Sequence, residues 1–254
     1  MTSQIAVTTE GEKATVTIDR PEKNNALTAG MYADLLDVFQ RFEDDESLSV
    51  VTIRGAGDHF SAGVDVGPVP EWGEATPRTI REQYEVTHEL LRTIESLGVP
   101  VVAALDGYAL GGALELAISC DIRVAHADAQ LGLPEANLGF SMDQGGPQKL
   151  PGMIGEGMTK YLVMTGKLID GQRAHEIGLV EEVAESAEAF ETQVEALEDR
   201  LEGQPTYVMD MAKRQIHGVR PQNLDEEMAR AIHHAITAYK EPETQRRTAE
   251  FLGE

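Results

Sequence analysis

The sequence contains a single cysteine, Cys120, and no run of eighteen or more apolar residues. One thiol cannot form a disulfide within the chain, which is typical of proteins in a reducing compartment. A helix that crosses a bilayer needs an apolar run of about that length. The first residues, MTSQIAVTTEGEK, also lack the basic, apolar and small-residue regions of an export signal. We therefore expect a cytoplasmic protein without a membrane partner, in which Cys120 is a buried small hydrophobic residue.

Basic residues are scarce: 21 Lys and Arg stand against 44 Asp and Glu, and the formal net charge is −23. The acidic residues are spread over the whole chain, so this charge is a property of the whole surface. Nucleic-acid binding requires a basic surface and is therefore not expected. Like charges repel one another in a compact fold, and salt screens that repulsion. We interpret the composition as adaptation to a salt-rich cytoplasm, as in a halophile.

The usual patterns for metals and nucleotides are also missing. The histidines are scattered along the chain, which predicts no metal site. Gly55 and Gly57 lack the Gly-Lys-Ser/Thr that completes a phosphate-binding loop. Gly107 and Gly111 do not complete a dinucleotide fingerprint. We therefore expect any catalytic activity to depend on residues other than metal ligands or a nucleotide-binding loop.

The chain is long enough, at 254 residues, for one sizeable domain. Strands and helices alternate up to about residue 133, which predicts an α/β core. The expected strands cover residues 4–18 (two strands), 50–54, 99–105, 121–125, 129–131 and 179–183, and the expected helices cover 28–42, 78–97, 111–120, 187–201, 205–217 and 224–238. Residues 66–77, rich in Pro and Gly around Trp72, predict a mobile loop. We divide the chain into a core, residues 1–185, and a helical C-terminal region, residues 186–254, that packs on the core or on another subunit.

The segment YALGGALE, residues 108–115, follows an apolar strand and opens a helix. Gly111 and Gly112 fall in the first helical turn, where N–H groups have no intrahelical partner and a ligand can approach the bare backbone. Such groups favour a developing negative charge. Glu115 lies three residues after Gly112 and so projects from the same face. Its neighbours are apolar on nearly every side, which predicts burial, and a buried carboxylate needs a partner or a function. We favour a catalytic interpretation over simple helix packing.

Three other positions carry candidate chemistry. In FSAGVD, residues 60–65, small residues follow a strand, so the N–H of Val64 can point outward; an ordinary loop capped by Asp65 is the alternative. Glu135 follows Pro134 and has apolar flanks that indicate partial burial. Asp143 precedes another expected helix, where it is either an N-cap or a third acid.

Together these segments resemble the crotonase (enoyl-CoA hydratase/isomerase) superfamily. The matching segments run in order along nearly the whole chain: RPEKNNAL (20–27), FSAGVD (60–65), GYALGGALELA (107–117), SCDIRVA (119–125), LPE (133–135), GG (145–146) and AEFL (249–252). The resemblance implies an α/β fold, a crotonase-like spiral of ββα units with a helical C-terminal region. It also implies homotrimers, often paired as a dimer of trimers.

The resemblance further implies roles for individual residues. The N–H groups of Val64 and Gly112 would form an oxyanion hole for the carbonyl oxygen of an acyl-CoA thioester. Glu115 and Glu135 stand at the two positions where hydratases of this superfamily carry glutamates. The resemblance places Ala62 by the adenine of CoA and residues 23–27 along the pantetheine and phosphates. The residues that it implies in substrate binding are Lys23, Asn25, Ala26, Leu27, Ala62, Gly63, Asp65 and Gly111. The acyl pocket is expected around Trp72, Phe140 and Met142.

The chain departs from the superfamily pattern at two places. Ala113 replaces a glycine that is common there, which is a mild change. Met142-Asp143 stands where many hydratases have Pro-Gly. In some isomerases of the superfamily an Asp at this place handles protons. Asp143 therefore leaves open isomerase activity or an acyl chain with a polar group.

We predict a 2-enoyl-CoA hydratase of fatty-acid or amino-acid breakdown. Glu115 would hold and activate water, and Glu135 would donate a proton to C2. No separate cofactor is expected, because CoA is part of the substrate. The nearest alternative is a CoA-ester isomerase that uses Glu135 or Asp143. A non-catalytic acyl-CoA- or RNA-binding member is the alternative of another class; the two glutamates argue against mere binding and the acidic charge argues against RNA.

Overall fold

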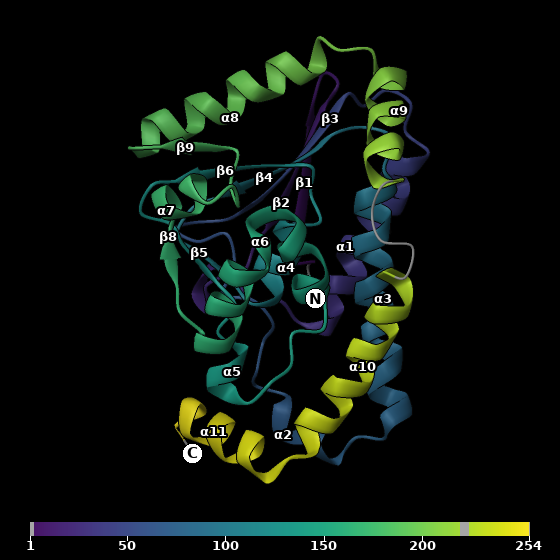
Figure 1. Ribbon diagram of the computed structural model, residues 1–254. Helices are drawn as coiled ribbons and strands as arrows, with labels where there is room; N and C mark the ends of the chain where they lie inside the picture. Colours follow the sequence, from purple (N-terminus) through teal and green to yellow (C-terminus); the bar gives the residue numbers. More distant parts are fainter. Residues whose placement is uncertain (1–2, 219–223, 254) are drawn as a thin grey trace.

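The computed structural model describes residues 3–218 and 224–253, and its core is built on two β-sheets (Figure 1). The larger sheet has the strand order β1-β2-β3-β4-β6-β9 and is parallel except for the β1–β2 hairpin. Its strands are β1 (Ile5–Glu10), β2 (Lys13–Ile18), β3 (Val50–Gly55), β4 (Val101–Leu105), β6 (Ile122–His126) and β9 (Glu182–Ala184). The smaller sheet, in the order β5-β7-β8, contains β5 (Tyr108–Leu110), β7 (Gln130–Gly132) and β8 (Ile169–Asp170).

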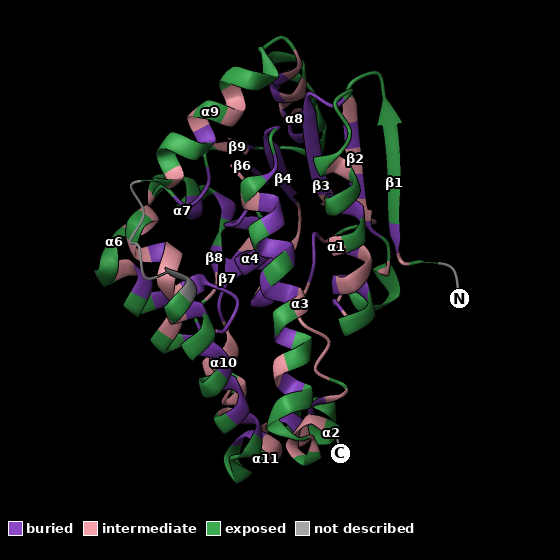
Figure 2. Cartoon of the chain, turned by 90° about the vertical axis from the view of Figure 1, so that its right-hand side faces the viewer, coloured by how far each residue is buried: buried purple, intermediate pink, exposed green. Residues whose placement is uncertain are grey.

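Burial follows the position of each strand in the sheet. All five residues of β4, VVAAL, are buried, as expected for a central parallel strand covered on both faces. In β2 buried residues alternate with partly exposed ones, and β1, at the edge, is exposed after its first residue. Figure 2 shows this gradient from the exposed β1 to the buried β4.

Three long helices cover the larger sheet. On one face, α1 (Ala29–Glu43) packs against α3 (Pro77–Ser96), and their buried residues join the main core. On the other face, α8 (Ala187–Glu202) crosses β3, β6 and β9 and encloses a separate apolar cluster around Phe190. The Thr28 side chain accepts the N–H of Met31 and so caps α1, as predicted.

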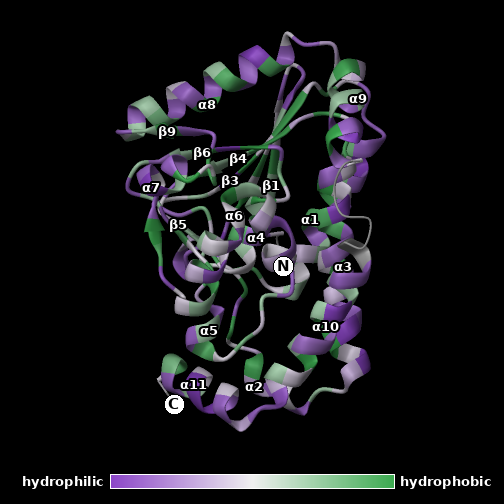
Figure 3. Ribbon diagram, in the orientation of Figure 1, coloured by the Kyte–Doolittle hydropathy of each residue, from purple (hydrophilic) through white to green (hydrophobic). Residues whose placement is uncertain are grey.

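The remaining helices complete the molecule. They are α2 (Val69–Glu74), α4 (Gly112–Ala117), α5 (Glu135–Leu138), α6 (Gly146–Thr165), α7 (Gly171–Glu176), α9 (Thr206–His217), α10 (Leu224–Lys240) and α11 (Pro242–Leu252), with a 3-10 turn at Pro21–Lys23. Helices α10 and α11 return along α3 and α2, so the end of the chain lies beside its middle (Figure 1). Hydrophobic residues gather in the central strands, whereas the outer helices mix both kinds (Figure 3). Within the described residues, no helix combines the length and apolarity that crossing a bilayer requires.

The structure corrects several local expectations. Residues 66–77 were expected to form a mobile loop but contain α2, because Val69 is buried and Trp72 packs on Tyr239 with ring centroids 5.1 Å apart. The helix expected over 111–120 ends at Ala117, and Tyr108–Leu110 form a strand. The strand expected at 179–183 lies at Glu182–Ala184. Cys120 is buried, as predicted.

Candidate active site

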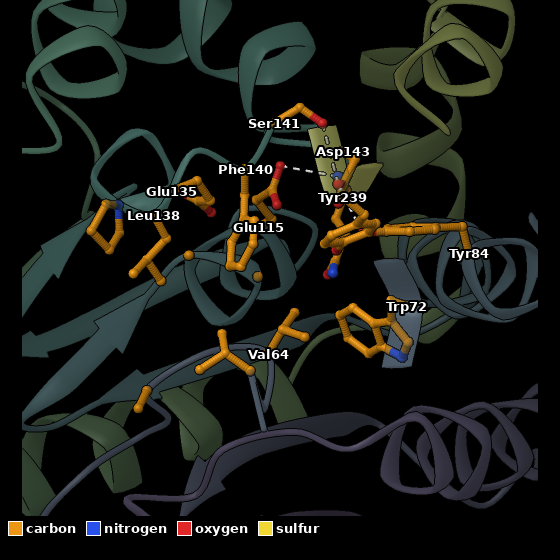
Figure 4. Close-up of a pocket in the computed structure, with 16 residues that line it drawn as sticks. Val64, Trp72, Tyr84, Glu115, Glu135, Leu138, Phe140, Ser141, Asp143 and Tyr239 are labelled. Carbon is orange, nitrogen blue, oxygen red and sulfur yellow. Dashed lines mark hydrogen bonds between the residues drawn. The ribbon is translucent and has the colours of Figure 1, made fainter. Parts of the chain in front are cut away.

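A cavity of about 80 Å³ lies between the starts of α4 and α5 on one side and the helices α3 and α10 on the other (Figure 4). Its walls come from the loop at residues 62–66, the start of α4, the start of α5, the segment 140–144, and side chains of α3 and α10. This volume has room for several water molecules. Glu115, Glu135 and Asp143 all line it. Three candidate acids that are distant in the sequence therefore line the same cavity.

Val64 lies in a short parallel bridge with Leu27. The N–H of Leu27 donates to Gly63 O at 2.8 Å, and the N–H of Asp65 donates to Leu27 O at 2.9 Å. In such a bridge the backbone groups of Val64 itself point away from Leu27. In the part of the chain that the structure describes, the N–H of Val64 has no acceptor, and neither has the N–H of Gly112.

Close backbone packing brings these two N–H groups together. A Cβ at Gly63, where φ is +92°, would lie 2.4 Å from Leu110 O and 3.5 Å from Gly112 N. A Cβ at Gly112 would lie 2.9 Å from Val64 Cγ2. Glycine at both positions therefore allows the Val64 loop to approach the first turn of α4. Two unpaired backbone donors at one cavity wall can bind an anionic oxygen.

Glu115 projects from α4 into the cavity and is 1% exposed. Its Oε1 accepts the N–H of Gly146 at 2.7 Å and that of Gln144 at 3.1 Å. Burial raises the pKa of Glu115 to about 7, and the two backbone hydrogen bonds partly offset that rise because they stabilise the charged form. Glu115 is therefore a group that changes protonation near neutral pH.

Glu135 is the first residue of α5 and faces the same cavity. Its Oε2 is buried and has no hydrogen-bond partner among the described residues. Burial, followed by the charge on Glu115, raises the pKa of Glu135 well above its ordinary value. The environment of Glu135 therefore favours its neutral form, whereas the two backbone hydrogen bonds to Glu115 favour its charged form.

Asp143 is 5% exposed and lies in the segment between α5 and α6. It is not the N-cap of α6, because that position is Gly145. The hydroxyl of Tyr84 donates to Asp143 Oδ2 at 2.9 Å. Burial and the charge on Glu115 raise the pKa of Asp143 well above its usual range. Asp143 is thus a third buried acid, held by a tyrosine.

Three residues of the cavity wall were not predicted from the sequence: Tyr84, Tyr239 and Gln144. The hydroxyl of Tyr32 donates to Gln144 Oε1 at 3.1 Å. The hydroxyls of Tyr84 and Tyr239 lie 2.5 Å apart although the residues are 155 positions apart in the sequence. From the sequence alone these tyrosines are indistinguishable from apolar residues of amphipathic helices. The hydrogen bonds of their hydroxyl groups become evident only in the folded chain.

The expected CoA-contacting residues differ in their placement. Ala62 and Gly111 line the cavity, and Lys23 is exposed. The side chain of Asn25 is fully buried and bonds to Arg20 N at 2.9 Å, Ala56 O at 2.9 Å and His59 O at 2.6 Å. All of its polar groups are therefore used to shape the 20–27 loop, so this side chain offers a ligand no contact.

Other expected contacts lie near the cavity. The carboxylate of Asp65 pairs with Arg20 at 2.7 Å. Leu27 and Asp65 border a second cavity of about 300 Å³, which shares a wall with the first. Of the three residues expected in the acyl pocket, Trp72 and Phe140 line the first cavity. Met142 instead packs against the main apolar core.

Comparison with known proteins agrees with this geometry. A model of the enoyl-CoA hydratase/isomerase family matches residues 8–250. The chain is 36% identical over 200 residues to the short-chain-enoyl-CoA hydratase of Clostridium acetobutylicum, covering 78% of this chain and 76% of that protein. It is 36% identical over 180 residues to the crotonyl-CoA hydratase of Syntrophomonas wolfei, covering 70% of this chain and 68% of that protein.

Solved structures show the same architecture. The crystal structure of an enoyl-CoA hydratase from Mycobacterium avium subsp. paratuberculosis matches with a TM-score of 0.89 at 26% identity, covering 98% of this chain and 96% of that chain. An enoyl-CoA hydratase from Bacillus halodurans has a TM-score of 0.91 at 22% identity, a likeness of fold alone. The predicted α/β class with a helical C-terminal region is confirmed. The chain belongs to the enoyl-CoA hydratase/isomerase family of the crotonase superfamily.

Proposed function

We propose that the protein is a 2-enoyl-CoA hydratase, which adds water across the C2–C3 double bond of an acyl-CoA thioester. One observation carries the proposal. Glu115 accepts two backbone N–H groups, whereas Oε2 of Glu135 has no partner among the described residues, and both acids line one cavity beside two unpaired N–H groups. Unequal environments push the pKa values of two acids apart, which is the arrangement that a paired base and acid require.

The oxyanion step uses the backbone. The thioester carbonyl oxygen accepts the N–H groups of Val64 and Gly112. When the oxygen of water bonds to C3, the π electrons of the C2–C3 bond move toward the thioester and charge develops on that oxygen as an enolate. Each preorganised donor of this kind contributes about 3–4 kcal/mol to stabilising the transition state.

The proton transfers use the two glutamates. Glu115, when ionised, accepts a proton from the attacking water while the C3–O bond forms. Glu135, which is neutral, gives its proton to C2 as the enolate collapses, and the product is a 3-hydroxyacyl thioester. Proton exchange with water then returns Glu115 to its ionised form and Glu135 to its neutral form. No separate cofactor takes part in this sequence.

We extend the proposal to the rest of the chain. The CoA moiety runs along residues 23–27 and the 62–65 loop, with Gly111 beside the thioester. The core, residues 1–185, carries this site, and the helical region, residues 186–254, contributes to a homotrimer or a dimer of trimers. The large acidic excess suits a salt-rich cytoplasm. The reaction belongs to the breakdown of fatty acids or amino acids.

A second candidate is isomerisation of a CoA ester. The observation in its favour is Asp143, a third buried acid in the same cavity, held by Tyr84. An isomerase would move a proton between two carbons through Glu135 or Asp143 without adding water.

Product analysis tests both candidates. Purified protein is incubated with crotonyl-CoA and, separately, with 3-hexenoyl-CoA, and the thioesters are separated by liquid chromatography with mass detection. Hydration adds 18 mass units, the mass of one water, to the first substrate, whereas isomerisation turns the second into 2-hexenoyl-CoA with no change of mass. Conversion of the 3-enoyl ester alone would replace the hydratase by the isomerase, and the absence of both products would refute both.

A further inference from the structure

The side of the cavity beyond Glu115 is polar. In Figure 4, Glu135 lies on one side of Glu115, and Asp143 and Tyr239 lie on the other, with Tyr84 beyond them. Trp72 and Phe140 give this side apolar walls. Three buried hydroxyl and carboxyl groups thus lie in a pocket that would otherwise be suited to a plain hydrocarbon tail.

These groups form one chain of hydrogen bonds. The hydroxyl of Tyr84 donates to Asp143 Oδ2 at 2.9 Å, and it lies 2.5 Å from the hydroxyl of Tyr239. Because the one hydroxyl hydrogen of Tyr84 is donated to Asp143, the hydroxyl of Tyr239 donates the hydrogen bond to Tyr84. The hydroxyl of Ser141 reaches the same Oδ2 at 3.5 Å. This series of hydrogen bonds therefore ends at Oδ2 of Asp143.

Both side-chain hydrogen bonds to the Asp143 carboxyl group, from Tyr84 and Ser141, go to Oδ2, and no other residue in the described part of the chain bonds to the second oxygen, Oδ1. Burial and the charge of Glu115 raise the pKa of Asp143 well above its usual range, which favours the neutral form of this carboxyl group. A neutral carboxyl group can donate as well as accept a hydrogen bond. A ligand in the cavity therefore meets one hydrogen-bonding position that the protein leaves open.

The surroundings hold this position rigidly. Nε2 of the buried His88 lies 2.6 Å from the backbone oxygen of Asp143. The ring of Tyr239 packs edge-on against Trp72 and Phe140, with centroids 5.1 Å and 5.5 Å away. A polar group that is fixed in advance binds its partner without having to be ordered first, which favours selective recognition.

We propose, on the basis of the hydratase function above, that the substrate is a 2-enoyl thioester whose acyl tail carries a neutral hydrogen-bonding group, such as a hydroxyl, which bonds to Asp143 Oδ1. The order of the side chains supports this assignment. With C2 beside Glu135 and C3 beside Glu115, the following carbons extend toward Asp143 and Tyr239 (Figure 4). The hydroxyl group therefore lies on a carbon beyond C3.

Other tails fit this position less well. An apolar tail would remove water from Oδ1 without replacing its hydrogen bond. A tail that ends in a carboxylate would bring a further negative charge next to Glu115, which carries charge during the reaction. A long apolar tail has an alternative in the neighbouring cavity of about 300 Å³, beside Leu27 and Ile80.

Matched substrate pairs test the proposal, because each pair replaces a hydroxyl by a methyl group. The pairs are 4-hydroxybut-2-enoyl-CoA with pent-2-enoyl-CoA, 5-hydroxypent-2-enoyl-CoA with hex-2-enoyl-CoA, and 6-hydroxyhex-2-enoyl-CoA with hept-2-enoyl-CoA. We expect kcat/KM to favour the hydroxyl member at least about ten-fold in one pair, since a site built to bond a hydroxyl rejects the analogue that lacks it. A preference for the methyl member in all three pairs would place the tail in the neighbouring cavity and overturn the proposal.

Variants identify the residue responsible. Asp143→Leu has nearly the same shape and should reduce the hydroxyl preference to about one, whereas Asp143→Asn, which mimics the neutral acid, should keep it. Tyr239→Phe provides a second test if Asp143→Leu fails to fold. Tyr207→Phe makes the same substitution on the surface, where Tyr207 is 68% exposed, and should change nothing. An unchanged preference in both Asp143→Leu and Tyr239→Phe would refute the assignment.

Binding measurements without turnover distinguish a failure of this inference from a failure of the proposed hydratase reaction. The saturated esters 5-hydroxypentanoyl-CoA and hexanoyl-CoA, with their shorter and longer homologues, cannot be hydrated, and calorimetry gives their Kd values directly. Tighter binding of a hydroxyl member, with loss of that preference in Asp143→Leu, supports the pocket even if no enoyl ester is turned over. Turnover without any hydroxyl preference in rate or Kd supports the reaction and rejects the pocket.

Discussion

Glu115 and Glu135 line one cavity, yet their carboxyl groups are in different environments. Oε1 of Glu115 accepts the backbone N–H groups of Gln144 and Gly146, whereas Oε2 of Glu135 is buried without a partner among the described residues. Two N–H donors stabilise a carboxylate, and burial without donors stabilises a neutral acid. This difference leads to three of the predictions that follow.

Replacing either glutamate by glutamine should lower kcat while acyl-CoA binding survives. Glutamine keeps the size of the side chain but can neither accept a proton as a base nor donate one as an acid, a contribution of about 10²–10⁴-fold. Hydration of crotonyl-CoA gives kcat, and calorimetry with butyryl-CoA gives Kd. The exposed Glu195 of α8 provides a matched control, because Glu195→Gln should leave both values unchanged. Near-normal hydration by Glu115→Gln or Glu135→Gln would remove that residue from the mechanism.

The pH dependence of kcat/KM should rise through about pH 7. Glu115 acts as a base in its ionised form, and its pKa of about 7 sets this limb. At higher pH the rate should fall again, because Glu135, whose pKa is also raised, loses the proton that it must donate. The profile is measured with crotonyl-CoA at constant ionic strength. A rate that is already constant from pH 5 upward would show that Glu115 is not the titrating base.

The same burial should make the protein less stable as pH rises. Glu115 has its pKa raised from 4.5 to about 7, so between these values the folded chain binds more protons than the unfolded chain. The free energy of unfolding must then fall with pH over that window. A shift of this size amounts to about 3 kcal/mol above pH 7. Urea unfolding should therefore find Glu115→Gln more stable than the wild type at pH 8 and nearly equal at pH 4, and equal stability at both pH values would contradict the prediction.

Local sequence patterns predicted the parts of the site that depend on local geometry. Gly112 and Glu115 lie three residues apart in one short helix, so their common direction follows from the helical period. The tyrosine pair could not be predicted, because Tyr84 and Tyr239 meet only when α10 folds back along α3. The helix α2 was missed for the same reason. Its Pro and Gly content predicts a loop, but packing of Trp72 on Tyr239 stabilises a helix there.

An alanine at Gly112 should impair catalysis without unfolding the protein. Its Cβ would lie 2.9 Å from the hydroxyl oxygen of Tyr32 and from Val64 Cγ2, and so would press on the oxyanion site. We expect kcat/KM to fall about 10²-fold, the effect of losing one oxyanion donor. Gly98→Ala is the control, since a Cβ there meets nothing within 4 Å. Equal activity of the two variants, with similar unfolding curves, would remove Gly112 from the site.

Asn25→Ala should destabilise the 20–27 loop. Asn25 has a left-handed φ of 56°, and its side chain satisfies Arg20 N, Ala56 O and His59 O in the interior. Its neighbour Asn24 has a similar φ of 50° but an exposed side chain. Asn24→Ala therefore places an alanine in the same left-handed conformation without removing buried hydrogen bonds. We expect Asn25→Ala to lose about 3 kcal/mol more than Asn24→Ala, because it leaves buried polar groups unpaired. Equal losses in urea unfolding would show that the side-chain hydrogen bonds contribute little.

The melting temperature should rise with added KCl. With a net charge of −23 the folded surface repels itself, and unfolding moves the charges apart. Potassium chloride shortens the Debye length from about 10 Å at 0.1 M to about 3 Å at 1 M, so most of the rise should come within this range. Sucrose at equal concentration is the control, since it favours compact states by exclusion without screening charge. A melting temperature that stays level in KCl but rises in sucrose would show that surface repulsion does not limit stability, and the acidic composition would then need another explanation.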